Sequence, residues 1–288
     1  MYPAAFEYLE PASLQQAVEF LGERGEDARI LAGGQSLVPL MKLRLARPKY
    51  LIDLNRVAGL DHIEVRDGSL VLGALARHAD IESSPIVRRT IPLLPQALRR
   101  LGDCQVRNLG SVGGAVVEAD PAGDWGPLIL ALNARIKCLG PRGEREIEAG
   151  DFFTFAYSTA LQADELVREI VIPIPNQPVL GEYVKLERIA GDFAVASVAL
   201  QADIDSDGIC RDVGIGLAGA GACPLKAIEA ENLLRGSRLS PELIERAGRE
   251  LEARANPISD LRGSAEYKKE VLRVIFARAM EQIIARRS

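Results

Sequence analysis

Residues 110–125 read GSVGGAVVEADPAGDW, a stretch in which small side chains come first and acidic ones follow. Glycine has no Cβ and lets backbone N–H groups turn toward a bound anion. Gly110, Gly113 and Gly114 therefore indicate a close contact between the main chain and such a guest. Adjacent glycines also occur in tight turns and where a helix packs on a strand. This stretch alone leaves both interpretations open.

A second glycine turn, AGGQS at 32–36, lies far upstream, after a short apolar strand and before a helical segment. Together with 111–115 it can offer backbone N–H groups to the two halves of one diphosphate without any basic side chain. Asp124 follows Ser111 by thirteen residues. At that distance its carboxylate can accept hydrogen bonds from hydroxyl groups of the same ligand, as acidic residues do for ribose.

Composition excludes several classes of protein. The 288 residues are 48% hydrophobic, which is enough for one large core or two or three smaller ones in a soluble globular protein. The net charge of −5 is spread without a run of five like charges, so nucleic acid and anionic membranes are not expected partners. The N-terminal MYPAAFEYLEP lacks the features of a signal peptide, and no apolar run approaches 18 residues. We therefore expect a cytoplasmic protein without membrane insertion.

The cysteines and histidines do not suggest a metal site or a hydrolase. The cysteines are Cys104, Cys138, Cys210 and Cys223, and no two form a CxxC pair. They are expected to be reduced and structural, which disfavours an iron–sulfur or zinc site on this chain. His62 and His78 are the only histidines, and neither has a nucleophile or paired carboxylate at motif spacing. A surface or packing role is expected for both, and no metal ligand is predicted.

Apolar periodicity divides the chain into two parts. The predicted segments are a helix from Ser13 to Gly22 or Gly25, strands at 29–32, 50–55 and 168–175, a hairpin at 60–75 that turns at Asp67-Gly68, strand-like segments between 181 and 219, and helices from Pro224, about Pro241 and Ala265 onward. Asn176-Gln177-Pro178 is the best candidate linker. We therefore expect domains at 1–176 and 177–288, the second an α+β domain of three strands followed by helices.

Two literal motif matches are set aside. GIGLAG at 214–219 fits the dinucleotide-binding pattern GxGxxG, but the expected helix begins only at Pro224 and no acidic residue follows at the required distance. DIDSDG at 203–208 resembles the start of a calcium loop, but Gly214 stands where a bidentate Glu is needed. A hairpin turn is the better interpretation of that segment.

A third segment, YVKLERIAGDFAVASVA at 183–199, completes an ordered set with AGGQSLVPLMKLR…LIDLN and QVRNLGSVGGAVVEADPAGDW. With these three motifs the chain closely resembles the medium, FAD-binding subunit of the molybdenum hydroxylases. This group includes aerobic carbon monoxide dehydrogenase, xanthine dehydrogenase and bacterial N-heteroaromatic dehydrogenases. The resemblance covers essentially all 288 residues.

The resemblance implies a fold and a cofactor site. The family fold is α+β: a two-subdomain, PCMH-type FAD-binding domain, here about 1–58 and 59–176, precedes a C-terminal α+β domain with a three-stranded sheet. Carried over by motif, the residues around the FAD diphosphate would be Leu31, Ala32, Gly33, Gly34, Gln35, Ser36 and Leu37, with Gly110, Ser111, Val112, Gly113, Gly114 and Ala115. Asp124 would bind ribose or ribityl hydroxyls, Leu101 would face the ring system, Leu166 or Val167 would line the pocket, and Lys185 and Phe193 would lie near the isoalloxazine.

The sequence departs from the family at three of these positions. Many relatives have His at the position of Gln35, Thr at Ser111, and Asp or Asn at Ala115. Gln35 and Ser111 keep hydrogen-bonding capacity, so the diphosphate site is expected to survive, whereas Ala115 leaves only a backbone contact there. Neither glycine turn contains histidine, so covalent flavin attachment through a turn is not expected.

By resemblance, the chain is the flavin subunit of a three-component enzyme. Substrate would be hydroxylated at a molybdenum–pterin centre on a large subunit. Two 2Fe–2S clusters on a small subunit would pass electrons to FAD and then to an external acceptor, in a dimer of heterotrimers. Carbon monoxide, purines, and nicotine-like or quinoline-like rings remain open as substrates.

No acid, base or nucleophile of this chain is expected to be catalytic, because the isoalloxazine carries the chemistry. Lys185 is the candidate for tuning the flavin, with a solvated strand-end lysine as its plain alternative, and Phe193 can equally be core. A stand-alone FAD-dependent oxidoreductase and a scaffold without cofactor remain alternatives for the whole chain.

Overall fold

The N-terminal part is a small parallel sheet with two helices, and the computed structural model describes residues 2–287 of the chain. Its elements are β1 (Glu7–Leu9), α1 (Leu14–Arg24), the short 3-10 helix η1 (Gly25–Asp27), β2 (Ala28–Leu31), α2 (Leu37–Lys42) and β3 (Tyr50–Asp53). The strands pair in the order β1-β3-β2. The Ser13 side chain caps α1 by accepting from the N–H of Gln16, as its sequence predicts. The first glycine turn follows the carboxyl end of β2, an edge where parallel sheets commonly bind ligands.

The second part is built on a five-stranded antiparallel sheet in the order β4-β5-β10-β6-β7. Its elements are β4 (Ile63–Arg66), β5 (Ser69–Gly73), α3 (His78–Ser83), α4 (Pro85–Thr90), α5 (Leu93–Leu98), α6 (Cys104–Leu109), α7 (Val112–Glu118), α8 (Trp125–Ala131), β6 (Arg135–Gly140), β7 (Gly143–Glu148), α9 (Ala149–Phe152), β8 (Phe153–Phe155), β9 (Ser158–Thr159) and β10 (Leu166–Pro173). Asp67 and Gly68 both have positive φ and join β4 to β5, so the predicted hairpin is confirmed.

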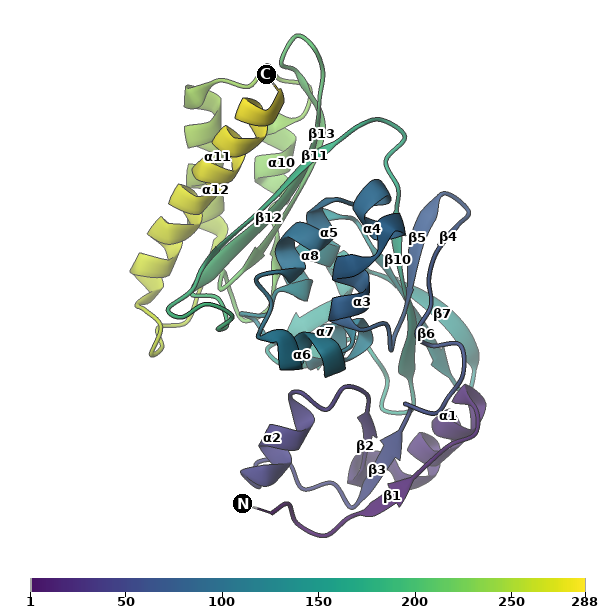
Figure 1. Ribbon diagram of the computed structural model, residues 1–288. Coiled ribbons are helices and arrows are strands. Elements are labelled where there is room, and N and C mark those ends of the chain that lie inside the picture. The colour runs from purple at the N-terminus through teal and green to yellow at the C-terminus, as the bar shows by residue number, and fades with distance from the viewer. Residues whose placement is uncertain (1, 288) are drawn as a thin grey trace.

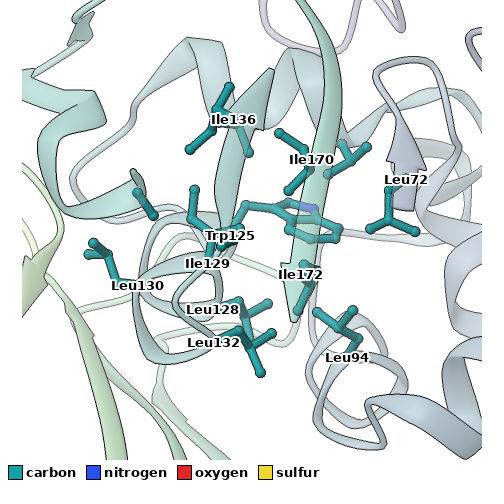
Figure 2. Packing of buried hydrophobic residues seen from close by; sticks show 14 of the residues in the cluster. Leu72, Leu94, Trp125, Leu128, Ile129, Leu130, Leu132, Ile136, Ile170 and Ile172 are labelled. Atoms are coloured by element: carbon teal, nitrogen blue, oxygen red, sulfur yellow. The ribbon is translucent and has the colours of Figure 1, made fainter. Parts of the chain in front are cut away.

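Trp125, the first residue of α8, lies at the centre of the largest core. Figure 2 shows side chains from α5, α8, β5, β6 and β10 gathered around its ring. They include Leu94, Leu128, Leu72, Ile136 and Ile170, all of which are fully buried. This core fixes α8 against the sheet and thereby sets the position of the loop that carries Asp124.

The C-terminal part is a four-stranded antiparallel sheet covered by three helices. Its elements are β11 (Leu180–Leu186), β12 (Ala196–Ile204), β13 (Cys210–Ala218), β14 (Leu225–Lys226), α10 (Ile228–Leu234), α11 (Pro241–Arg254) and α12 (Ala265–Arg287). Three strands followed by helices were expected, and the structure adds the two-residue β14, which pairs with β13. DIDSDG forms the turn between β12 and β13, where Asp205 accepts from the N–H groups of Asp207 and Ile209. The hairpin interpretation of that segment is confirmed.

None of the helices in residues 2–287 combines the length and the apolar character needed to cross a membrane.

The two larger sheets enclose a layer of helices (Figure 1), and α8 lies directly on the C-terminal sheet. A Cβ placed on Gly214 would stand 1.9 Å from the carbonyl oxygen of Ala131, and one on Gly216 would stand 2.0 Å from that of Pro127. The neighbouring Ile215 points to the opposite face, into the core beneath α12. The glycines of GIGLAG therefore allow one domain to pack against the other, which explains the literal motif match.

Candidate functional site

The two glycine turns, far apart in sequence, meet in space. A Cβ added to Gly33 would stand 2.3 Å from the carbonyl oxygen of Leu109 and 2.7 Å from the Cα of Gly110. A Cβ on Gly114 would lie 3.8 Å from that of Ala32. Real Cβ atoms do not approach backbone atoms as closely as 2.3 Å, so the first position requires glycine. The contact brings the carboxyl end of β2 against the start of α7.

The first turn offers backbone donors. Among the hydrogen bonds within residues 2–287, no protein group accepts from the N–H of Gly33, Gly34, Gln35 or Ser36. Gly34 has φ +70°, a conformation that glycine adopts without strain. The Gln35 side-chain amide donates to the carbonyl of Gly33 at 3.0 Å, so this donor is used within the turn. Four successive N–H groups without a protein acceptor can together bind an anion.

The second turn contributes fewer donors than its glycines suggest, and the nest expected there is largely absent. The N–H groups of Val112, Gly113 and Ala115 donate to backbone carbonyls within the protein, and that of Gly114 donates to the Ser111 hydroxyl at 3.3 Å. Within residues 2–287 the N–H of Ser111 alone in this group has no protein acceptor.

Gly113 in particular serves packing. A Cβ there would stand 2.7 Å from both the Cβ and the carbonyl oxygen of Ala74. The plain interpretation of the opening stretch, a packing point, therefore holds for this glycine.

An arginine and an asparagine that sequence reasoning did not single out connect the turns. The Arg77 guanidinium donates to the Leu109 carbonyl at 2.5 Å and to the Asn55 side chain at 2.5 Å. Asn55 in turn donates to the Ala32 carbonyl at 2.9 Å. Asn55 ends the LIDLN motif, but nothing local in the sequence reveals its partner 22 residues downstream.

His78 lies beneath the second turn and is 3% exposed. Its Nδ1 accepts a hydrogen bond from Trp125 Nε1 at 3.1 Å, and its ring would contact a Cβ on Gly110 at 2.9 Å. Burial, followed by the charges of Arg77 and Arg107, lowers the pKa of His78 to about 3. The imidazole is therefore neutral at physiological pH, and the expected packing role is confirmed.

Replacing His78 with Gln should make the protein less sensitive to acid. The pKa of His78 is about 3 when folded and 6.5 in the unfolded chain, so the unfolded state takes up the proton first. Stability from the neutral ring is complete above pH 6.5 and falls by about 1.4 kcal/mol per pH unit as pH drops toward 3. Gln can still accept from Trp125 but does not titrate. Urea unfolding between pH 4.5 and 7.5 should show that the free energy of unfolding falls less steeply with pH in His78→Gln than in wild type. An equal slope in both proteins would contradict this account.

Asp124 forms a buried cluster with residues of β11. Its Oδ1 accepts from the Tyr183 hydroxyl at 2.5 Å, and Lys185 Nζ lies 3.0 Å from the same oxygen. Lys185 also lies 3.3 Å from Glu187 Oε2 and donates to the Arg100 carbonyl at 3.1 Å. Burial raises the pKa of Asp124, while the Lys185 charge opposes that rise. The alternative of a solvated lysine is wrong, because the side chain of Lys185 is fully buried.

Lys185→Met should destabilise the protein by about 3–5 kcal/mol at neutral pH, because it leaves Asp124 as a buried charge without a cation. Removing the cation also raises the pKa of Asp124 further, so the folded variant binds a proton more readily than the unfolded chain. The difference from wild type should therefore shrink as pH falls from 8 to 5. Unfolding curves at pH 8 and pH 5 measure this difference in stability. The double variant Asp124→Asn/Lys185→Met is the matched control, because it removes both charges. A difference independent of pH would count against the ion pair.

The remaining predicted residues fall into two environments. Leu101, Leu166 and Val167 are at most 8% exposed and belong to apolar cores; Ala32 packs against the cluster that contains Leu166. Phe193 is 44% exposed in the loop between β11 and β12, so it is not core, and Arg262 lies 5.7 Å from its ring centroid. A Cβ on Gly191 in that loop would stand 2.7 Å from the Gly102 carbonyl. The loop therefore borders the segment that runs from Leu101 to the second turn.

Comparison with known proteins identifies the relatives of this arrangement. Residues 4–175 match the FAD binding domain in molybdopterin dehydrogenase, and residues 182–283 match the CO dehydrogenase flavoprotein C-terminal domain. The glyceraldehyde dehydrogenase medium chain of Sulfolobus acidocaldarius is 38% identical over 98% of this chain and all of its own length. The nicotine 6-hydroxylase medium subunit of Paenarthrobacter nicotinovorans is 38% identical over 98% of both chains.

A solved structure agrees with these relatives over the whole fold. Carbon monoxide dehydrogenase from Hydrogenophaga pseudoflava, in a form that lacks the Mo-pyranopterin moiety of its cofactor, superposes with a TM-score of 0.97. It is 38% identical and covers 99% of both chains. With both domain families matched in order, this chain belongs to the family of FAD-binding medium subunits of molybdenum-containing dehydrogenases.

Proposed function

We propose that this chain holds FAD between its two glycine turns and passes electrons from a partner subunit to an external acceptor. In the proposed enzyme, 2Fe–2S clusters of a small subunit supply the electrons after a large subunit hydroxylates the substrate at a molybdenum–pterin centre. We also propose that two such heterotrimers form a dimer in the cytoplasm. Within this chain, we place the boundary between the two domains at 176/177.

The contact between Gly33 and the Leu109–Gly110 backbone carries the proposal. It lies beside five N–H groups for which residues 2–287 provide no acceptor, those of residues 33–36 and of Ser111. A diphosphate needs such donors at close range, and bare backbone provides them without a side chain in the way. The residues present thus fit the diphosphate of FAD. Gln35 donates within its own turn, and Ala115 adds no polar side chain, so backbone groups form most of this proposed contact.

The chain's own residues would bind and orient the cofactor rather than react. When bound, FAD supplies the exchange of two electrons. Leu101 and Phe193 would border the ring side, since their segments are in contact through Gly102 and Gly191. Asp124 and Lys185 would support that side, because Lys185 pairs with Asp124 and also donates to the Arg100 carbonyl beside Leu101. The paired charge of Lys185 would act on the flavin less strongly than a free cation.

Reconstitution with FAD tests the proposal. The purified chain should acquire the visible absorption of a bound flavin at a stoichiometry of about one per chain. Coexpression with candidate large and small subunits should yield a complex that contains molybdenum and iron as well as flavin. A chain that stays colourless in excess FAD would refute the cofactor assignment. A flavoprotein that never associates with partners and oxidises substrate alone would support the stand-alone alternative.

A further inference from the structure

We propose that Asn55 and Arg77 are positioning residues, which hold the two glycine turns at the separation that a diphosphate requires. This inference rests on the proposed FAD site and adds to it two residues that do not belong to either turn. Neither is proposed to react.

The two side chains form one continuous connection. From the first turn, the Ala32 carbonyl accepts from Asn55 Nδ2 at 2.9 Å, and Asn55 Oδ1 accepts from Arg77 Nη2 at 2.5 Å. Arg77 Nη1 then donates to the Leu109 carbonyl at 2.5 Å, directly before the second turn. Both carbonyls belong to residues at the point where the turns touch. The connection therefore spans the contact that brings the donors of both turns together.

Each side chain is itself held in place at its base. The N–H and the side-chain amide of Asn55 both donate to Asp53 Oδ1, at 2.9 and 2.5 Å, and Asp53 also accepts from the Tyr8 hydroxyl. The backbone of Arg77 forms a bridge with Ser111, with Val112 N–H donating to the Ala76 carbonyl at 3.0 Å. Arg77 therefore starts beside the second turn and reaches back to the first through Asn55. Its planar guanidinium can address two acceptors at once, which a lysine cannot do in the same geometry.

Arg77 also brings a positive charge to the contact between the two turns. Gln35, Ser36 and Ser111, the polar side chains of the turns, are all neutral. Arg77 thus places a fixed positive charge against the backbone where the turns meet. A positive charge close to two phosphates favours their binding even without direct contact.

The test is the affinity of the full chain for FAD and for ADP, which shares the diphosphate but lacks the flavin ring. Arg77→Met should weaken both by about the same factor, roughly 10-fold or more. Arg77→Lys should recover only part of the loss. Asn55→Ala should also weaken both ligands, and the double variant should bind little worse than Arg77→Met, because the two residues act in one connection.

Arg145→Met is the matched control. Arg145 also joins a side chain and a backbone carbonyl, since it contacts Glu165 at 2.7 and 2.8 Å and the Ala160 carbonyl at 2.8 Å. The Arg145→Met substitution should lower the unfolding temperature without changing the affinity for FAD or for ADP.

The outcomes separate this inference from the proposed function. If the wild-type chain binds neither FAD nor ADP, the FAD site itself is wrong. If the wild type binds both and Arg77→Met binds them equally well, the positioning role is wrong and the site stands. Equal loss of affinity in Arg77→Met and Arg145→Met would show a general effect on folding and overturn the inference. Strictly additive losses at Asn55 and Arg77 would also overturn it.

Discussion

Gly33→Ala should weaken FAD binding by about 100-fold while the chain stays folded. The added methyl carbon would stand 2.3 Å from the Leu109 carbonyl oxygen, so the two turns must separate by about 1 Å to restore ordinary contact. Gly33 has no positive φ, so the effect comes from this contact and not from backbone strain. Gly33 is half-buried and is not a member of any of the three apolar cores, so the cores should remain intact.

Fluorescence titration with FAD measures this effect, and circular dichroism verifies the fold. Gly22→Ala is the control, because a Cβ on that helical glycine meets nothing within 4 Å. Gly113 is unsuitable for the comparison, since a bulky residue there strikes Ala74 and should impair folding first. Unchanged affinity in Gly33→Ala would mean that the contact between the turns has no part in binding.

Gly216→Val should destabilise the whole protein by about 3 kcal/mol or more. Its Cβ would stand 2.0 Å from the Pro127 carbonyl oxygen, and the two methyl groups would push further into α8. The backbone of a helix cannot yield as a flexible side chain can. The cost should therefore appear as separation of α8 from the C-terminal sheet, with exposure of the buried faces of both.

Urea unfolding and limited proteolysis measure this prediction. The variant should unfold at lower urea and be cleaved between the two domains, near residues 174–179, more rapidly than wild type. Gly150→Ala serves as the control, since a Cβ there meets nothing within 4 Å. If Gly216→Val unfolds at the same urea concentration as wild type, the close packing of α8 on β13 is wrong.

Local signals in the sequence predicted much of the fold. The cap at Ser13 and the turn at Asp67-Gly68 depend on neighbouring residues alone, and both were predicted correctly. No helix or strand was predicted at 128–139, where α8 ends at Ala131 and β6 begins at Arg135, because both elements are short and only three residues separate them. The two-residue β14 was missed since so short a strand has no periodicity of its own.

The site was predictable only where a motif carried it. Both glycine turns were found from their residue types, and their contact is confirmed. Residue types did not reveal which backbone N–H groups are used within the protein, such as that of Gly113, which donates to the Ala74 carbonyl. Pairs joined across long separations, such as Asp124 with Lys185 or Asn55 with Arg77, have no local signature. Tertiary packing alone sets those contacts.

A crystal structure of this chain with FAD tests the central claim most directly. The diphosphate should lie between the two turns, beside the backbone N–H groups of residues 33–36 and of Ser111. FAD bound with its diphosphate away from the contact between Gly33 and Leu109 would contradict it.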